Sequence, residues 1–191
     1  MSAPATGRDA LLTRAIGHFA EHGVGDTSLR ALAEEIGTSH RMLIYHFGSR
    51  EGLLAAVVDT VEQGARDTLA RMVEEARAET DPLEAGLRYW HMVTDDALVY
   101  GPLFFELSSH AMLGLPHAAE LRERLVTTWL GALETMWTTR GVPPLAARQQ
   151  ARLDLAVARG LLHDLLLTGD RPAVDGAMQA YAADTVARLL P

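Results

Sequence analysis

Residues 37–54, GTSHRMLIYHFGSREGLL, concentrate side chains that can bind a nucleic acid. His40 and Arg41 open a short run with helical spacing, and Tyr45 and His46 close it. An arginine can donate a bidentate pair of hydrogen bonds to guanine O6 and N7, and a histidine can reach a base edge or a phosphate. The segment therefore carries the chemistry of a base-reading surface, provided that a helix presents these side chains together.

A helix over this run would separate an apolar face from a polar one. At roughly 100° per residue, Ser39, Leu43 and Phe47 share one face of such a helix. Arg41 and Tyr45 project from the opposite face. The spacing predicts a helix that buries its apolar side and offers the other side to a ligand.

Glycine and hydroxyl residues mark the helices that must hold this run in place. Apolar residues at three and four spacing over residues 11–20 predict a first helix. Gly23 and Gly25 end it, because glycine tolerates backbone angles that other residues avoid. Thr27 or Ser28 can then cap a second helix, since a side-chain oxygen satisfies free backbone N–H groups there.

The third helix follows after a tight turn. Gly37 breaks the second helix, Ser39 can cap the third, and Gly48 supplies a permissive residue at its C-terminal end. Two short helices joined by such a turn are typical of a helix-turn-helix, whose second helix lies in the DNA major groove. On that helix Met42 and Ile44 can contact thymine methyl groups.

Several motifs occur together in this N-terminal region. They are Phe19, Gly23, Thr27 and Ser28, LAEEIGTS, Leu43, HF at 46 and 47, and SREGLL from residue 49. As a set they fix the helix starts, the turn glycine, the apolar core and the entry to the next helix. The region, roughly residues 9–57, resembles the tetracycline-repressor (TetR) family of one-component bacterial transcriptional regulators.

The resemblance implies a role for individual positions. It implies phosphate contacts for Ser28, His46 and Arg50. It implies base-facing roles for Arg30, His40, Arg41 and Met42. With the helix positions above, the predicted DNA-binding set is Ser28, Arg30, Ser39, His40, Arg41, Met42, Ile44, Tyr45, His46 and Arg50.

Two positions depart from the family pattern. Arg41 stands where the family usually has a small residue. Ile44 stands where the family usually has a tyrosine, and the hydroxyl here follows one residue later, on Tyr45. These departures predict an unusual operator sequence.

The charge of the chain excludes DNA binding through bulk positive charge. The 191 residues carry a formal net charge of −8, and up to Ala55 five arginines face six acids. We therefore expect local contacts, doubled by a symmetric dimer and supported by the N-terminal dipoles of the helices.

Composition predicts a soluble protein of the cytoplasm. Hydrophobic residues make up 48% of the chain, enough for a buried core. The chain has no cysteine, which excludes disulfides and thiolate metal sites. No apolar run approaches the roughly 18 residues of a membrane-spanning helix, and the N-terminus lacks the pattern of a secretion signal.

Proline and glycine breaks divide the rest of the chain into five further expected helices. Asp81 and Pro82 start the fifth, which we expect to end near Tyr100. The motifs GPLFFEL, GLPHAAEL, GVPPLAAR and GDRPAVDG then open the sixth to the ninth. The sequence thus predicts an all-α fold of about nine helices, the count that the resemblance implies. We expect a helix-turn-helix domain over residues 1–48 and an effector-binding and dimerisation domain over residues 49–191.

The middle helices concentrate large apolar side chains. In the family this part binds a small-molecule effector, so the resemblance implies a pocket for a mostly apolar ligand. The candidate lining residues are Trp90, Phe104, Phe105, Met112, Trp129 and Met136. The polar groups expected to orient a ligand are His91, Asp95, Glu106, His110 and His163. The alternative is that these large side chains simply fill the core.

The last two expected helices carry leucine and alanine stripes that suit helix-on-helix packing. The resemblance implies a four-helix homodimer interface with the second copy of the chain. The candidate interface residues are Leu161, Leu165, Met178 and Tyr181. The alternative is that these stripes close the core of a single chain.

Two other functional classes remain as alternatives. His91 with Asp95, and Glu106 with His110, stand four residues apart and can place two metal ligands or an acid and a base on one helix face. No third ligand, phosphate loop or nucleophile motif accompanies them, so we predict no enzyme, cofactor, metal or catalytic residue. The second alternative is a helical adaptor that does not bind DNA.

The sequence therefore predicts a cytoplasmic, homodimeric, ligand-responsive regulator. We expect it to bind a palindromic double-stranded DNA operator, most simply as a repressor. A small effector would weaken DNA binding by as much as it prefers the non-binding conformation.

Overall fold

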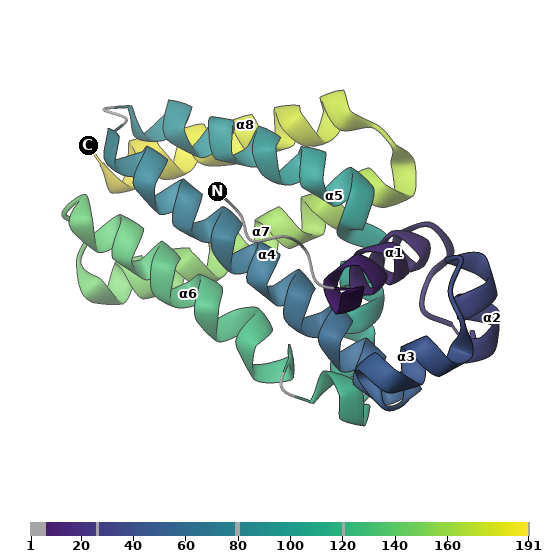
Figure 1. Cartoon of the computed structure of the whole chain (residues 1–191). Helices are drawn as coiled ribbons and strands as arrows, with labels where there is room; N and C mark the ends of the chain where they lie inside the picture. Colours follow the sequence, from purple (N-terminus) through teal and green to yellow (C-terminus); the bar gives the residue numbers. More distant parts are fainter. Residues whose placement is uncertain (1–6, 26, 79–80, 120, 191) are drawn as a thin grey trace. The chain divides into compact units, whose positions relative to one another are not determined.

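The structure, a computed structural model, describes residues 7–25, 27–78, 81–119 and 121–190, and these are all-α (Figure 1). The helices are α1 (Gly7–His22), α2 (Leu29–Glu35), α3 (His40–Phe47), α4 (Arg50–Ala78), α5 (Pro82–Met112), α6 (Leu121–Thr139), α7 (Pro144–Thr168) and α8 (Arg171–Leu189). A 3-10 turn, η1 (Pro116–Ala118), precedes α6. The predicted all-α fold with its N-terminal helix-turn-helix is confirmed.

The fifth helix is longer than we expected from the sequence. The break predicted before Pro102 does not form, and α5 continues to Met112. A proline inside a helix costs about 3 kcal/mol because it removes a hydrogen bond and crowds the preceding turn. Leu103 and Leu107 follow it and are fully buried, which contributes about 1.5 to 3 kcal/mol each and offsets that cost. The break expected before Pro102 was therefore wrong, and the described residues form eight α-helices where about nine were expected.

The chain divides into two compact units. Unit 1 comprises Met1–Gln63 and Pro102–Glu123, and unit 2 comprises Gly64–Gly101 and Arg124–Pro191. The helix α5 contributes residues to both. The division into functional domains at residue 48, which we predicted from the sequence, stays a prediction.

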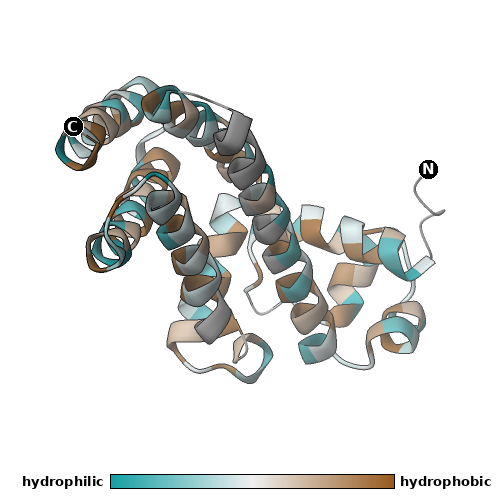
Figure 2. Ribbon diagram, turned by 90° about the vertical axis from the view of Figure 1, so that its left-hand side faces the viewer, coloured by the Kyte–Doolittle hydropathy of each residue, from teal (hydrophilic) through white to brown (hydrophobic). Residues whose placement is uncertain are grey.

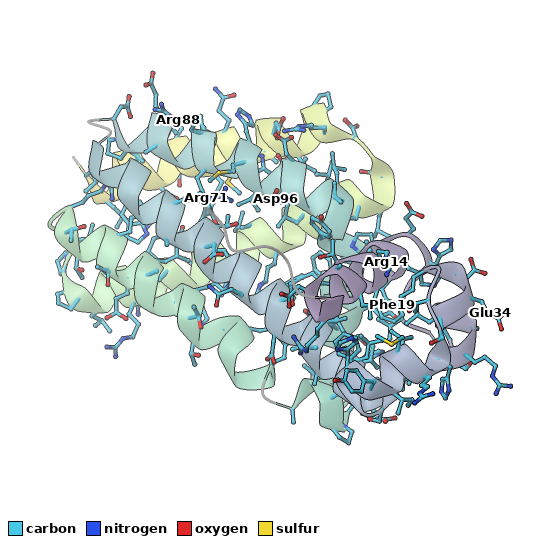
Figure 3. The ribbon with its side chains drawn as sticks, viewed as in Figure 1. Arg14, Phe19, Glu34, Arg71, Arg88 and Asp96 are labelled. Carbon is cyan, nitrogen blue, oxygen red and sulfur yellow. The ribbon has the colours of Figure 1, made fainter. Side chains whose placement is uncertain are left out.

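Each helix of unit 1 contributes an apolar side chain that is buried. Phe19 of α1, labelled in Figure 3, and Leu32 of α2 are almost completely buried. Leu43 of α3, Leu53 of α4 and Leu107 of α5 are fully buried. Because burying a leucine contributes about 1.5 to 3 kcal/mol, these side chains hold the short helices α2 and α3, which are too short to be stable alone.

The core of unit 2 includes contacts between α5, α7 and α8. Trp90 of α5 packs in one buried cluster with Leu165, Val174 and Met178. Its indole N–H donates to Asp175 Oδ1 at 2.6 Å, so the buried ring is also satisfied as a hydrogen-bond donor. Helices α7 and α8 lie side by side, as Figure 1 shows.

A polar network joins α6, α7 and α8. Asp154 accepts hydrogen bonds from the Tyr181 hydroxyl at 2.8 Å, the Gln150 amide at 2.7 Å and the Trp137 indole at 2.6 Å. Arg188 donates to Gln150 Oε1 at 2.8 Å. Burial, together with the hydrogen bond and charge of Asp154, raises the pKa of Tyr181 and keeps its hydroxyl protonated. The network therefore fixes which faces of these three helices meet.

The helices of both units carry hydrophobic and hydrophilic residues in alternation along their length, as the colours in Figure 2 show. This pattern is typical of helices that bury one side and expose the other. Among the described residues, no helix is long and apolar enough to cross a membrane.

Candidate nucleic-acid interface

Serine caps define the starts of α2 and α3, as the sequence predicted. Ser28 Oγ accepts a hydrogen bond from the backbone N–H of Ala31 at 3.2 Å. Ser39 Oγ accepts one from the backbone N–H of Met42, also at 3.2 Å. Gly37, in the turn between the helices, has φ +66°, a conformation that favours glycine. The helix starts are thus set by local side-chain chemistry.

The α3 helix separates its two faces as expected. Leu43 and Phe47 are buried in unit 1. On the other side Arg41 is exposed, Ile44 is 40% exposed and Tyr45 is 78% exposed. This arrangement leaves a base-reading face of α3 open to solvent.

The other predicted DNA-binding residues differ in their exposure. His40 and Met42 are exposed on α3, and Arg30 is exposed on α2. His46 is half-buried, and its ring makes an edge contact with the Tyr45 ring at a centroid distance of 4.9 Å. His46 therefore has less freedom to move toward a phosphate than the exposed side chains.

The turn between α2 and α3 is held by an arginine that the sequence analysis missed. Arg14, labelled on α1 in Figure 3, donates from Nη1 to the backbone carbonyl of Ile36 at 2.8 Å and that of Gly37 at 3.5 Å. Ile36 is the C-terminal cap of α2. An unpaired carbonyl at a helix end is costly to bury, so Arg14 stabilises the turn. Nothing in the local sequence shows this contact, because it spans 22 residues.

A second arginine of α1 lies near the end of α3. The Arg8 guanidinium lies over the Phe47 ring, 5.2 Å from its centroid. Such a cation–π contact contributes about 0.5 to 1 kcal/mol at an exposed site. Arg8 is exposed and so adds a positive charge beside α3 that our predicted set did not include.

Arg50 occupies a different environment from the one we expected. Its guanidinium donates to the backbone carbonyls of Thr27 at 3.0 Å, Val24 at 3.3 Å and Gly25. These carbonyls belong to the loop between α1 and α2. The phosphate contact predicted for Arg50 stays a prediction. In the structure, its guanidinium binds the backbone carbonyls of this loop.

The same loop is held from α5 by Glu106. Its Oε2 accepts from the Val24 N–H at 2.7 Å, and its Oε1 accepts from the Gly25 N–H at 3.0 Å. From the sequence, Glu106 is expected to orient a ligand. In the structure, both carboxylate oxygens instead accept hydrogen bonds from the backbone of the loop that leads into α2.

The predicted ligand-pocket residues do not form one cluster within either unit. Trp129 and Met136 pack together against the cluster of Leu133 and Ala151 in unit 2. Trp90 belongs to a separate cluster of that unit. The other three, Phe104, Phe105 and Met112, belong to unit 1.

The predicted dimer residues lie on the inner side of α7 and α8. Leu165 and Met178 are only 1% and 9% exposed, in the same cluster as Trp90. Leu161 and Tyr181 are partly buried against that cluster. These side chains therefore contribute to the core of unit 2, the role we considered as the alternative. Homodimerisation through these residues stays a prediction.

The two acid–histidine pairs that suggested an enzyme are engaged with other partners. Asp95 pairs with Arg171 at 2.6 Å, and His91 lies 3.9 Å from Asp175. His110 Nδ1 lies 3.0 Å from His117 Nε2. Among the residues that the structure describes, no group of three or more histidine, cysteine, aspartate or glutamate side chains is placed to hold a metal ion.

Comparisons with known proteins agree with this geometry. Residues 11–57 match the model of the bacterial regulatory proteins, tetR family. A transcriptional regulatory protein of helix-turn-helix type from Mycobacterium tuberculosis, RaaS, is 42% identical over 69 residues. That alignment covers 36% of this chain and spans about a third, 32%, of the relative's own length.

Two solved structures extend the likeness to the whole fold. A transcriptional regulator from Rhodococcus sp. Rha1 has a TM-score of 0.79 at 21% identity, covering 95% of this chain and 96% of its own. A protein from Saccharomonospora viridis, solved in complex with choline, has a TM-score of 0.70 at 20% identity, covering 94% of each chain. At these identities the two structures show a shared fold.

Proposed function

We propose that this chain, whose residues 11–57 match the tetR family of bacterial regulatory proteins, represses transcription as a homodimer whose two α3 helices enter the major groove of a palindromic operator. The observation that carries this proposal is the exposed face of α3. Arg41 and Tyr45 lie on that face, while Leu43 and Phe47 fix the opposite face in the core. A regulator bound at an operator would exclude the transcription machinery from the same DNA.

The exposed residues of α3 suit direct readout of bases. Arg41 can form a bidentate pair with guanine, and His40 can reach a base edge or a phosphate. Met42 and Ile44 offer apolar atoms to thymine methyl groups. Tyr45 has a hydroxyl that can donate to a phosphate or a base. The face therefore combines hydrogen-bonding and apolar groups that distinguish base pairs.

Phosphate contacts would come from the edges of the helix-turn-helix. Arg30 and Ser28 lie at the start of α2, where the free N–H groups of the first turn favour an anion. Arg8 adds an exposed charge near Phe47. Because the formal net charge is −8, each of these local contacts is important. Operator affinity should fall as the salt concentration rises, with a slope that corresponds to only a few neutralised phosphates per subunit.

The exposed sides of α7 and α8 support the proposed homodimer. On α7, Leu153 is 50% exposed and Leu167 is 74% exposed, with the small residues Ala156 and Gly160 between them. On α8, one exposed stripe consists mainly of small residues: Ala173, Gly176, Ala177, Ala180, Ala183 and Ala187. Small side chains let helices approach closely, and the exposed leucines supply apolar area. Two copies of these paired helices would form a four-helix interface.

We propose that a small, mostly apolar effector binds within residues 49–191 and releases the operator. Tyr89, Trp129 and Met136 are partly buried and pack against Leu133 and Ala151 in unit 2, and such aromatic and sulfur-containing side chains suit an apolar ligand. The complex of a similarly folded protein with choline supports testing ligands that combine a cation with apolar groups. The larger set named from the sequence, including Trp90, Phe104, Phe105 and Met112, stays a prediction.

The cytoplasm is the proposed site of action, because bacterial operators lie there. Residues 1–48 would contact DNA, and residues 49–191 would bind the effector and the second subunit.

Selection from random duplex DNA tests the proposal directly. The purified protein should enrich one sequence with two inverted half-sites, because a symmetric dimer presents two copies of α3. Enrichment of a single half-site would contradict the dimer. If no sequence is enriched at low salt, where phosphate contacts are strongest, the DNA-binding function itself is refuted.

A further inference from the structure

The loop between α1 and α2 is held by a carboxylate from a distant part of the chain. The N–H groups of Val24 and Gly25 donate to Glu106, which follows them by 82 and 81 residues. Each carboxylate oxygen accepts one of these hydrogen bonds, at 2.7 and 3.0 Å. Hydrogen bonds to an ionised acceptor are roughly twice as strong as neutral ones. These two hydrogen bonds are therefore stronger than bonds between neutral groups. All three residues belong to unit 1.

The backbone of the loop is shaped to receive this carboxylate. Gly23 and Gly25 have φ values of +77° and +37°, which L side chains rarely adopt. A Cβ atom on Gly23 would lie 3.2 Å from Glu106 Oε2, so the acid approaches the backbone closely. Successive N–H groups in such a turn form a concave site for an anion. Here the acid on α5 fills that site.

The opposite edge of the loop is held by a cation. The carbonyls of Val24, Gly25 and Thr27 accept hydrogen bonds from Arg50 at the start of α4. The loop then continues directly into Ser28, whose hydroxyl caps α2. Two ionised side chains from two other helices thus fix the point at which the helix-turn-helix begins.

We propose that Glu106 is a positioning residue for operator binding, through which α5 sets the place of the α1–α2 loop and of the N-terminal end of α2. This inference rests on the proposed DNA-binding function. The N-terminal end of α2 carries Ser28 and Arg30, two of the predicted DNA-binding residues. Without the contact to Glu106, the loop would present Ser28 and Arg30 in many orientations. Ordering these residues on DNA would then cost conformational entropy and weaken binding.

The helix that carries Glu106 also contributes to the unit proposed to bind the effector. Residues Pro82–Gly101 of α5 belong to unit 2, and the helix continues from Pro102 to Met112 in unit 1. Glu106 stands one turn after Pro102. A shift of α5 along its axis would therefore move the carboxylate relative to the Val24 and Gly25 amides.

Glu106→Gln is the sharpest variant for a test. The side chain keeps its shape, but one carboxylate oxygen becomes an NH₂ group that cannot accept a hydrogen bond. One of the two loop amides then loses its acceptor, and the other loses an ionised one. The matched control is Glu21→Gln on α1, which removes the same charge from a side chain of unit 1 that is 79% exposed.

The experiment measures two quantities for each protein: the Kd for the operator duplex selected by the wild type, and the hydrogen exchange rates of the Val24 and Gly25 amides. In Glu106→Gln we expect the Kd to rise by about tenfold or more and both amides to exchange faster. In Glu21→Gln we expect both quantities to stay within about twofold of the wild type. Circular dichroism confirms that each protein is folded at the assay temperature.

The outcomes separate this inference from the proposed function. Operator affinity within twofold of the wild type in folded Glu106→Gln overturns the positioning role, even if its melting temperature falls, because Glu106 would then be structural only. If Glu106→Gln does not fold, Glu106→Asp carries the test, since it keeps the charge but is one methylene too short to reach both amides. A wild type that selects no DNA overturns the proposed function and this inference together.

Discussion

The replacement Arg41→Ala tests whether α3 reads bases. Arg41 is exposed on the same face as Ile44 and Tyr45, and alanine is the residue that best favours a helix. The substitution should change the stability of the fold by no more than about 0.5 kcal/mol. Any larger loss of DNA binding must then come from the interface with DNA.

The size of the loss follows from the geometry of the proposed dimer. A bidentate pair between an arginine and a guanine contributes about 1 to 3 kcal/mol of discrimination against the wrong base. Two symmetric subunits present Arg41 twice, so the loss on the best operator should reach about 2 to 6 kcal/mol. This corresponds to a rise in Kd of about 30-fold to more than 10⁴-fold.

The assay compares the variant on the selected operator and on operators changed at each position. Arg41→Ala should lose affinity for the best operator and lose its preference at one base pair in each half-site. The control, Arg88→Ala, removes an equal charge from an exposed position in unit 2 and should leave the base preferences unchanged. A loss of equal size on every sequence would refute base reading by Arg41 and assign it to the phosphates.

Three further predictions concern the supporting structure. Leu167→Glu, at a position 74% exposed on α7, should convert the dimer to a monomer in light scattering at micromolar concentration and weaken operator binding; an unchanged dimer would contradict the proposed interface. Arg14→Ala should lower the free energy of unfolding by about 1 to 3 kcal/mol in urea, because it leaves the Ile36 carbonyl without its donor; a change below about 0.5 kcal/mol would show that this contact is dispensable. Burial, then the charges of His110 and Arg50, lower the pKa of His117 below its ordinary value, so the unfolded state binds more protons and stability should fall as the pH drops below about 6.5. His117→Asn should reduce this acid sensitivity in urea titrations at pH 7 and pH 5.5, and an identical pH dependence in both proteins would exclude His117 as its source.

Local sequence signals predicted the helix-turn-helix well. Ser28 and Ser39 act as caps, and Gly37 and Gly48 have positive φ, because these roles depend on neighbours within a few residues. The burial of Leu43 likewise follows from helical spacing alone. Such features are readable because the cause and the residue lie in the same short segment.

Contacts between distant segments could not be read in this way. The contact between Glu106 and the loop spans more than 80 residues, so the sequence suggested a ligand role for a side chain that binds backbone amides. Pro102 suggested a break, but burial of the residues after it keeps α5 continuous. The leucine stripe of α7 was apparent, but which of its sides faces the core depends on α5 and α8. In each case tertiary packing overrides a local signal.

Methylation interference on the selected operator tests whether α3 binds in the major groove. A methyl group on guanine N7 blocks the major-groove edge that Arg41 would contact. We expect interference in two patches related by a two-fold axis, with centres about one helical turn or a multiple of it apart. With Arg41→Ala, the interference at one guanine of each patch should disappear. Binding that tolerates N7 methylation throughout the operator would contradict the proposal that α3 reads the major groove.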